Sequence, residues 1–147
     1  MTMTHVSSIE KSIHEFNVWI KDIKFELKCS DHDAYTALHS TLHSLRDRLP
    51  VESVAHLGAQ LPIIIKGVFY DKWSPKSTPE RVDKMTFTSR VHSHFNNDPS
   101  INPENVIQTV FFVMQKHIDK NELDNVKAAL PPKIENLFDL AAQKGST

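Results

Sequence analysis

Two histidines and an aspartate follow one another at intervals of four residues near the start of the second quarter of the chain. If this stretch is helical, His39, His43 and Asp47 lie one turn apart along one flank. Imidazole nitrogens and carboxylate oxygens are ligands for Zn²⁺ and similar ions, so the spacing permits a metal site. Successive members of such a set drift by about 40° around a straight helix, so a further ligand from another helix would be needed. The sequence identifies none, and we predict no specific metal site and no cofactor; the alternative is a solvated histidine pair.

Four basic residues are a second set with possible chemistry. They could bind an anion if the fold brings them together, and they are Arg46, Arg48, Lys66 and Arg81. The structural alternative is that arginines bind carboxylates and the carbonyl groups at helix C-termini.

Two aromatic residues, Tyr70 and Trp73, lie beside a proline-rich stretch and could be an exposed anchor for a protein partner. The alternative is that they pack beneath that stretch. No glycine-rich phosphate loop, GxSxG turn or HExxH motif occurs, and Cys29 has no supporting pattern for a nucleophile. No catalytic motif is therefore recognisable, and we predict no catalytic residues.

A leucine stripe predicts the helix that carries the histidine pair. Leu38, Leu42, Leu45 and Leu49 fall on one side of a helix that starts near Asp31, after a Ser30 cap, and we expect them to be buried. Proline residues at 50 and 62 then predict a second and a third helix, with a break at the joint before Pro62. Gly67 lies inside the third helix at a cost of about 1 kcal/mol relative to alanine, which suggests close packing or a functional close approach.

Four or five further helices follow from the same rules. Isoleucine, phenylalanine and leucine spacing predicts an amphipathic helix from Ile9 to about Lys28. Asn102 before Pro103 predicts a helix start, and Asp119 with Glu122 predicts a capping box. No segment alternates convincingly as a strand would, so the prediction is an all-α bundle of about eight helices.

The pattern of the leucine helix and its followers recurs sixty-nine residues later. An Ala-x-Leu-Pro-x-x-Ile string begins at Ala59 and again at Ala128. The leucine stripe corresponds to Ile107, Phe111, Met114 and Ile118. Helical periodicity alone does not align prolines, so we predict two similar four-helix halves within a single domain, 1–147. The halves are about 9–72 and 84–143, with residues 73–83 as the connector; coincidence of amphipathic helices is the alternative.

Composition limits the class of partner. The 147 residues hold 17 basic and 18 acidic side chains, so no global field attracts nucleic acid or anionic lipid. A lone cysteine and an N-terminus without an apolar run favour the cytoplasm. The most apolar segment, Leu61 to Tyr70, is interrupted by Lys66 and is shorter than the ~20 residues of a membrane span. We expect a soluble protein that binds neither nucleic acid nor membrane.

A set of arginine, proline and aromatic positions resembles a known family. The set comprises Leu45-Arg46-Asp47-Arg48-Leu49-Pro50, Ala59-Gln60-Leu61-Pro62, Lys66-Gly67, Tyr70, Trp73, Pro75, Pro79 and Arg81. It resembles the bacterial family called domain of unknown function 2267, roughly from the first helix to Phe138. The resemblance implies an all-helical fold in a small bacterial cytosolic protein and no established activity. Lys66 stands where the family usually has arginine and Lys72 where glycine commonly precedes the tryptophan, so neither an anion-binding role nor a tight turn is carried over there.

These observations leave the activity unknown and favour a non-enzymatic binding or protein-interaction module, acting on a protein partner or by self-association. The alternative is a ligand- or metal-dependent protein or enzyme. It would use the flank of His39, His43 and Asp47, or the arginine and lysine anion site.

Overall fold

The computed structural model describes residues 6–142. These residues form eight α-helices and a short 3₁₀ turn, η1 (Pro75–Ser77). The helices are α1 (Ser7–Leu27), α2 (Asp31–Arg48), α3 (Val51–Gly58), α4 (Ile63–Tyr70), α5 (Lys84–Ser93), α6 (Pro103–His117), α7 (Lys120–Ala128) and α8 (Pro132–Ala142). No strand occurs among these residues, so the predicted all-α fold is confirmed. None of the eight helices is both long and apolar enough to cross a membrane.

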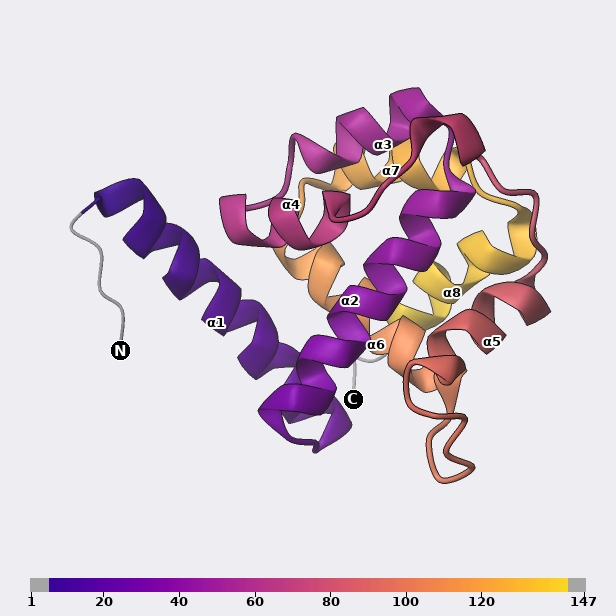
Figure 1. Cartoon of the computed structure of the whole chain (residues 1–147), viewed down its shortest axis with the longest axis horizontal. Coiled ribbons are helices and arrows are strands. Elements are labelled where there is room, and N and C mark those ends of the chain that lie inside the picture. The colour runs from indigo at the N-terminus through magenta and orange to yellow at the C-terminus, as the bar shows by residue number, and fades with distance from the viewer. Residues whose placement is uncertain (1–5, 143–147) are drawn as a thin grey trace.

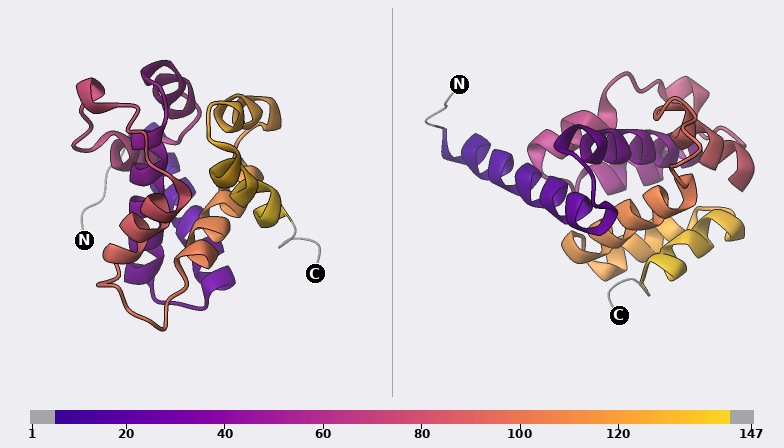
Figure 2. Two further views of the ribbon diagram at one scale, coloured as in Figure 1. Left: turned by 90° about the vertical axis from the view of Figure 1, so that its right-hand side faces the viewer. Right: turned by 90° about the horizontal axis from the view of Figure 1, so that it is seen from below.

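Helices α2 and α6 lie at the centre of one hydrophobic core. A first layer formed by α2–α4 covers a second layer formed by α6–α8, and α1 and α5 flank them (Figure 1, Figure 2). The four residues of the leucine stripe on α2 are fully buried, as predicted. His39 and His43 lie on a flank of α2 beside this stripe, and both are half-buried.

Two predicted helix starts are confirmed by their caps. At the start of α2 the Ser30 hydroxyl accepts a hydrogen bond from the amide of Asp33 at 3.1 Å. At the start of α6 the Asn102 side chain accepts from the amide of Glu104 at 3.0 Å, and Pro103 is the first helical residue. Both caps satisfy amides that have no partner inside the helix.

The predicted capping box at α7 is only half right. Asp119 does cap the helix, because its carboxylate accepts from the amide of Asn121 at 2.9 Å. Glu122 does not return to Asp119; its carboxylate lies against the imidazole of His56 of α3. A partner from another helix thus replaces the local bond, and it ties α7 to α3.

The turn between α3 and α4 repeats between α7 and α8. The predicted break before Pro62 is confirmed, since α3 ends at Gly58 and α4 begins at Ile63. The amides of Val54, Gln60, Leu61 and Lys66 donate to the carbonyls of Pro50, Leu57, Gly58 and Pro62. Sixty-nine residues later, the amides of Leu123, Ala129, Leu130 and Glu135 donate to the carbonyls of Asp119, Val126, Lys127 and Pro131. The two joints therefore share the same backbone hydrogen bonds.

The first turns of α1 extend beyond the body of the bundle (Figure 1). Trp19, Ile20 and Ile23 are buried, whereas Ile13 is 39% exposed. The predicted helix is confirmed, and the apolar residue Ile13 near its start is partly exposed. The reason is that α4 contacts α1 through Ser12, whose hydroxyl accepts from the amide of Ile64 at 2.9 Å.

The close approach expected at Gly67 occurs at another glycine. A Cβ added at Gly67 would have no heavy atom within 4 Å, so the interpretation as a close-packed or closely approached position is wrong. A Cβ added at Gly58 would lie only 2.6 Å from Cζ of Tyr70. The ring of Tyr70 therefore rests directly on the backbone of α3.

Candidate functional site

The guanidinium group of Arg46 is hydrogen-bonded to groups of the protein itself. Its side chain is 5% exposed, and one terminal nitrogen donates to the carbonyls of Phe69 at 2.9 Å and Asp71 at 2.8 Å. Its Nε donates to the Asp47 carboxylate at 2.8 Å. The arginine thus holds the C-terminal end of α4, which is the structural role given as the alternative to anion binding.

The side chains of the other three basic residues of the predicted anion set make no hydrogen bond or ion pair among residues 6–142. Arg48 and Lys66 are half-buried in α2 and α4, and Arg81 is exposed in the connector. The Nε of Arg48 is buried without an acceptor. An anion site at these positions would have to form without Arg46.

His39 and His43 lie together on α2, with ring centroids 4.0 Å apart, and His94 at the end of α5 is 6.0 Å from His39. The Val68 carbonyl is 2.6 Å from Nε2 of His43, and because a carbonyl only accepts, this nitrogen carries the ring proton. Burial lowers the pKa of His43 to about 4. Burial, with the nearby charge of His94, also lowers the pKa of His39. Both imidazoles are therefore neutral at pH 7.

The carboxylate of Asp47 accepts a hydrogen bond from Nε of Arg46 at 2.8 Å. In the part of the chain that the structure describes, no three histidine, cysteine or acidic side chains are placed to hold a metal ion. His94 was not in the predicted set, because helical spacing within α2 carries no information about which residue of α5 lies opposite it.

The aromatic pair after α4 packs inward. The Tyr70 hydroxyl is 3.4 Å from the carbonyl of Val54, and the rings of Tyr70 and Trp73 are 5.6 Å apart. Both residues are half-buried, and the indole nitrogen of Trp73 is buried. This arrangement agrees with the packing alternative and not with an exposed anchor.

Cys29 has the electrostatics of an unreactive thiol. Burial raises the pKa of its thiol, and the carboxylate of Asp33 raises it further. The protonated thiol is a weak nucleophile, so the surroundings of Cys29 do not prepare it for covalent catalysis.

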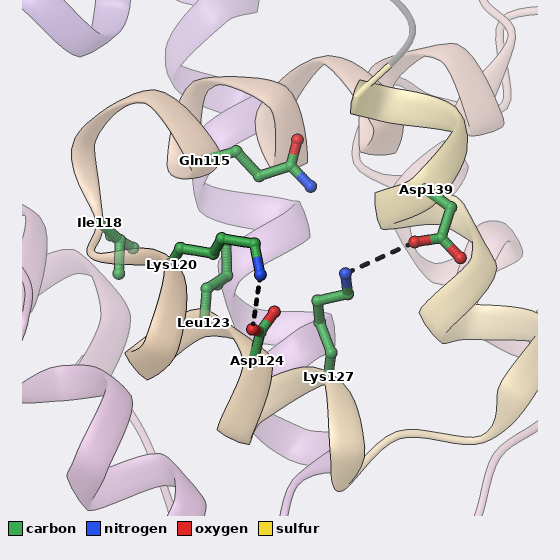
Figure 3. Close-up of a pocket in the computed structure, with 7 residues that line it drawn as sticks. All are labelled: Gln115, Ile118, Lys120, Leu123, Asp124, Lys127 and Asp139. Atoms are coloured by element: carbon green, nitrogen blue, oxygen red, sulfur yellow. Dashed lines mark hydrogen bonds and ion pairs between the residues drawn. The ribbon is translucent and has the colours of Figure 1, made fainter.

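A pocket of about 290 Å³ opens between α6, α7 and α8 (Figure 3). It is lined by Gln115, Ile118, Lys120, Leu123, Asp124, Lys127 and Asp139. Ile118 and Leu123 are buried and form its apolar floor. Lysine and aspartate side chains stand around the floor as two ion pairs, one within α7 and one between α7 and α8. The sequence analysis did not identify this pocket.

An apolar edge lies where α1 meets α4. Ile13 and Ile63 are 39% and 51% exposed, and they directly adjoin Ser12 and Ile64, which share a hydrogen bond. That bond joins the two helices, and both exposed isoleucines are the sequence neighbours of the residues that form it.

An all-helical bundle is the class of protein that the structure defines for residues 6–142. The chain belongs to the family described as uncharacterized conserved protein (DUF2267), which matches residues 16–137. The resemblance stated from the sequence is thereby confirmed, and the family description assigns no activity. No curated protein matches the chain.

Lys72 stands where the family commonly has a glycine before the tryptophan, which is Trp73 in this chain. Its φ of 59° lies in the left-handed region, which glycine adopts without a steric cost. The tight turn is therefore present although the glycine is absent, and the lysine backbone carries the strain.

Proposed function

We propose that this protein is a non-enzymatic interaction module of the bacterial cytoplasm, which binds a protein partner through the edge formed by α1 and α4. The observation that carries the proposal is the pair of exposed isoleucines, Ile13 and Ile63, next in sequence to the residues of the half-buried Ser12–Ile64 hydrogen bond. Exposed apolar side chains on a fixed edge gain free energy when a partner covers them.

The rival function is a ligand- or metal-dependent protein or enzyme. It is less well supported, because Arg46 donates to Phe69 and Asp71, and His43 donates to Val68. Arg46 would have to give up its carbonyl acceptors before it could bind an anion, whereas His43 could keep its bond to Val68 and bind a metal ion only through Nδ1.

The two-half architecture is part of the same proposal. Arg46 donates to the Phe69 carbonyl, and sixty-nine residues later Gln115 donates to the Phe138 carbonyl at 3.1 Å. Together with the matching bonds of the two joints, this supports halves at about 9–72 and 84–143; residue 143 lies outside the described residues. In an experimental structure, residues 31–70 should superpose on residues 100–139, and failure of α2–α4 to align with α6–α8 would contradict the repeat.

The edge can be tested by site-specific photo-crosslinking in the cells of origin. Benzoylphenylalanine at position 63 should give one discrete cross-linked species, either a dimer of this chain or a complex with another protein. The matched control is benzoylphenylalanine at position 25, since Phe25 is an exposed apolar residue of α1, 78% accessible, far along the helix from Ser12. Equal cross-linking from both positions would contradict the proposal.

A further inference from the structure

Two buried side-chain N–H groups without a hydrogen-bond acceptor lie at the connector, residues 73–83. In the part of the chain that the structure describes, these groups are Nε of Arg48 and the indole nitrogen of Trp73. Trp73 is the first residue of the connector, and Arg48 is the last residue of α2. The carbonyl of Asp47, next to Arg48, accepts from the connector amide of Glu80 at 2.7 Å. A buried N–H group without an acceptor is costly, so the two donors point to a bound acceptor beside the connector.

The hydrogen bond between Glu80 and Asp47 also brings a second arginine to the end of α2. Arg81 follows Glu80 and Arg48 follows Asp47, so the Cα atoms of the two arginines lie within about 10 Å of each other by standard bond lengths. Each side chain is long enough to bring its guanidinium group to the middle of that distance. One small ligand at the end of α2 can therefore contact both members of this arginine pair (Arg48 and Arg81).

The acidic side chains next to the arginine pair in the chain are bound elsewhere. The carboxylate of Asp47 accepts from Nε of Arg46 at 2.8 Å, and the carboxylate of Glu80 is 2.5 Å from the guanidinium group of Arg90. The carboxylate of Asp83 caps the start of α5. Because these acids have other partners, the arginine pair keeps two positive charges that no carboxylate of residues 6–142 neutralises.

We propose that the arginine pair binds a phosphate group, either as inorganic phosphate or on a phosphate monoester. The phosphate of a monoester carries a charge of about −1.5 to −2 at pH 7, which matches two unpaired guanidinium groups better than the single charge of a carboxylate does. Phosphate oxygens also accept paired N–H bonds from the planar guanidinium group. The site uses half of the predicted anion set and needs neither Arg46 nor Lys66. The inference goes beyond the proposed function, because the arginine pair lies at the end of α2 and in the connector and not on α1 or α4.

The test is a titration of the ¹⁵N-labelled full chain with inorganic phosphate, methyl phosphate and acetate at constant ionic strength, followed through the arginine Nε–H resonances. The Arg48 resonance should shift and saturate with either phosphate compound. The Arg46 resonance is an internal control and should stay in place, because its Nε already donates to Asp47. Tighter binding of methyl phosphate would identify a monoester as the ligand class, and tighter binding of inorganic phosphate would identify the free ion. An Arg48 shift that does not saturate, or an equal shift with acetate, would overturn the site.

Matched variants separate the arginine pair from the general positive charge of the connector. Arg81→Gln changes an exposed residue and should weaken phosphate binding about tenfold or more, with thermal unfolding unaltered. Lys76→Gln is the control, because it removes the same charge from an exposed residue of the same connector. It should change the affinity by less than about twofold, as expected for a screened surface charge.

A second variant tests the buried donor itself. Arg48→Lys keeps the positive charge at the end of α2 but has no Nε donor, so it should weaken phosphate binding by a similar factor to Arg81→Gln. Unchanged affinity in Arg81→Gln, or equal losses in Arg81→Gln and Lys76→Gln, would overturn the proposal. Cross-linking from position 63 does not depend on these side chains, so failure of this site is distinguishable from failure of the proposed function.

Discussion

The side-chain amide of Gln115 donates a hydrogen bond to the carbonyl oxygen of Phe138 across 3.1 Å. Arg46 makes the corresponding bond to Phe69 at 2.9 Å, and it adds bonds to Asp71 and Asp47. In each layer a polar residue on the central helix thus donates to a carbonyl of the last helix. The first layer does so with a charge, and the second with a neutral amide.

These bonds predict unequal effects of removing the two side chains. Arg46→Ala leaves buried carbonyl groups without a donor and should destabilise the protein by roughly 3 kcal/mol, whereas Gln115→Ala should cost about 1 kcal/mol. Arg46→Gln, which introduces the side chain found in the second layer, should recover part of the loss. Urea unfolding followed by circular dichroism measures all three, and equal losses for Arg46→Ala and Gln115→Ala would contradict the assignment.

The two glycines of the first layer should respond to alanine in opposite directions. Gly67→Ala adds a methyl group in open space inside α4 and should stabilise the protein by about 0.5 to 1 kcal/mol. Gly58→Ala places a Cβ against Tyr70 and should destabilise by about 1 to 3 kcal/mol, as overpacking does. Thermal unfolding of both variants shows whether each substitution stabilises or destabilises the protein. Because the clash is with the tyrosine ring, the penalty should shrink in a Tyr70→Ala background.

The strained turn before Trp73 predicts a stabilising substitution. Lys72→Gly relieves a left-handed lysine and should raise the free energy of unfolding by about 1 kcal/mol. Lys76→Gly is the control, since Lys76 lies in the same connector, in η1, without a positive φ. The control should lose up to about 1 kcal/mol through the greater freedom of the unfolded chain. A loss at both positions would show that the turn does not require glycine.

Local sequence signals predicted the elements of this fold, because proline, cap residues and the leucine stripe act within a few residues. The starts of α2 and α6 and the break before Pro62 are confirmed for this reason. The contact partners of long side chains were not predictable in the same way. Glu122 lies against His56, and that contact depends on α3 and α7 meeting in space.

The pocket lined by α6–α8 shows the same limit more sharply. The exchange of Gly58 and Tyr70 for Lys127 and Asp139, sixty-nine residues later, is visible in the sequence once the offset is known. Its consequence is not visible, because only the structure shows that Tyr70 lies on Gly58. Aligning the sequences of the two halves reveals the core positions that they share. Which sequence differences open a pocket can be recognised only when the side-chain packing of one half is known.

His43 predicts how stability depends on pH. Its folded pKa of about 4 is below the ordinary value of about 6.5, so the unfolded chain binds the proton more tightly. Stability from this group is therefore fully present above about pH 6.5 and falls as the pH is lowered toward 4. The loss should be roughly 1 to 2 kcal/mol after allowance for partial exposure. Urea unfolding at intervals between pH 7 and pH 4 should show this slope, and His43→Gln should flatten it; an unchanged slope would assign the loss to other groups.

The last prediction concerns metal ions at the flank of α2. His43 already donates from Nε2 to Val68, and Asp47 accepts from Arg46, so binding of an ion by His39, His43 and Asp47 together would require the carboxylate to leave its arginine. Breaking that half-buried pair costs free energy that two histidine ligands on adjacent turns do not recover. We therefore expect no stoichiometric stabilisation when metal-free protein is titrated with Zn²⁺, Ni²⁺ or Mn²⁺ during thermal unfolding. An ion that bound only the folded chain would add about 2.7 kcal/mol at a hundred times its dissociation constant, which such a titration detects readily. A rise of that size that disappears in both His43→Ala and His39→Ala would establish a metal site and favour the rival function, and loss in His94→Ala as well would add the histidine of α5 as its third ligand.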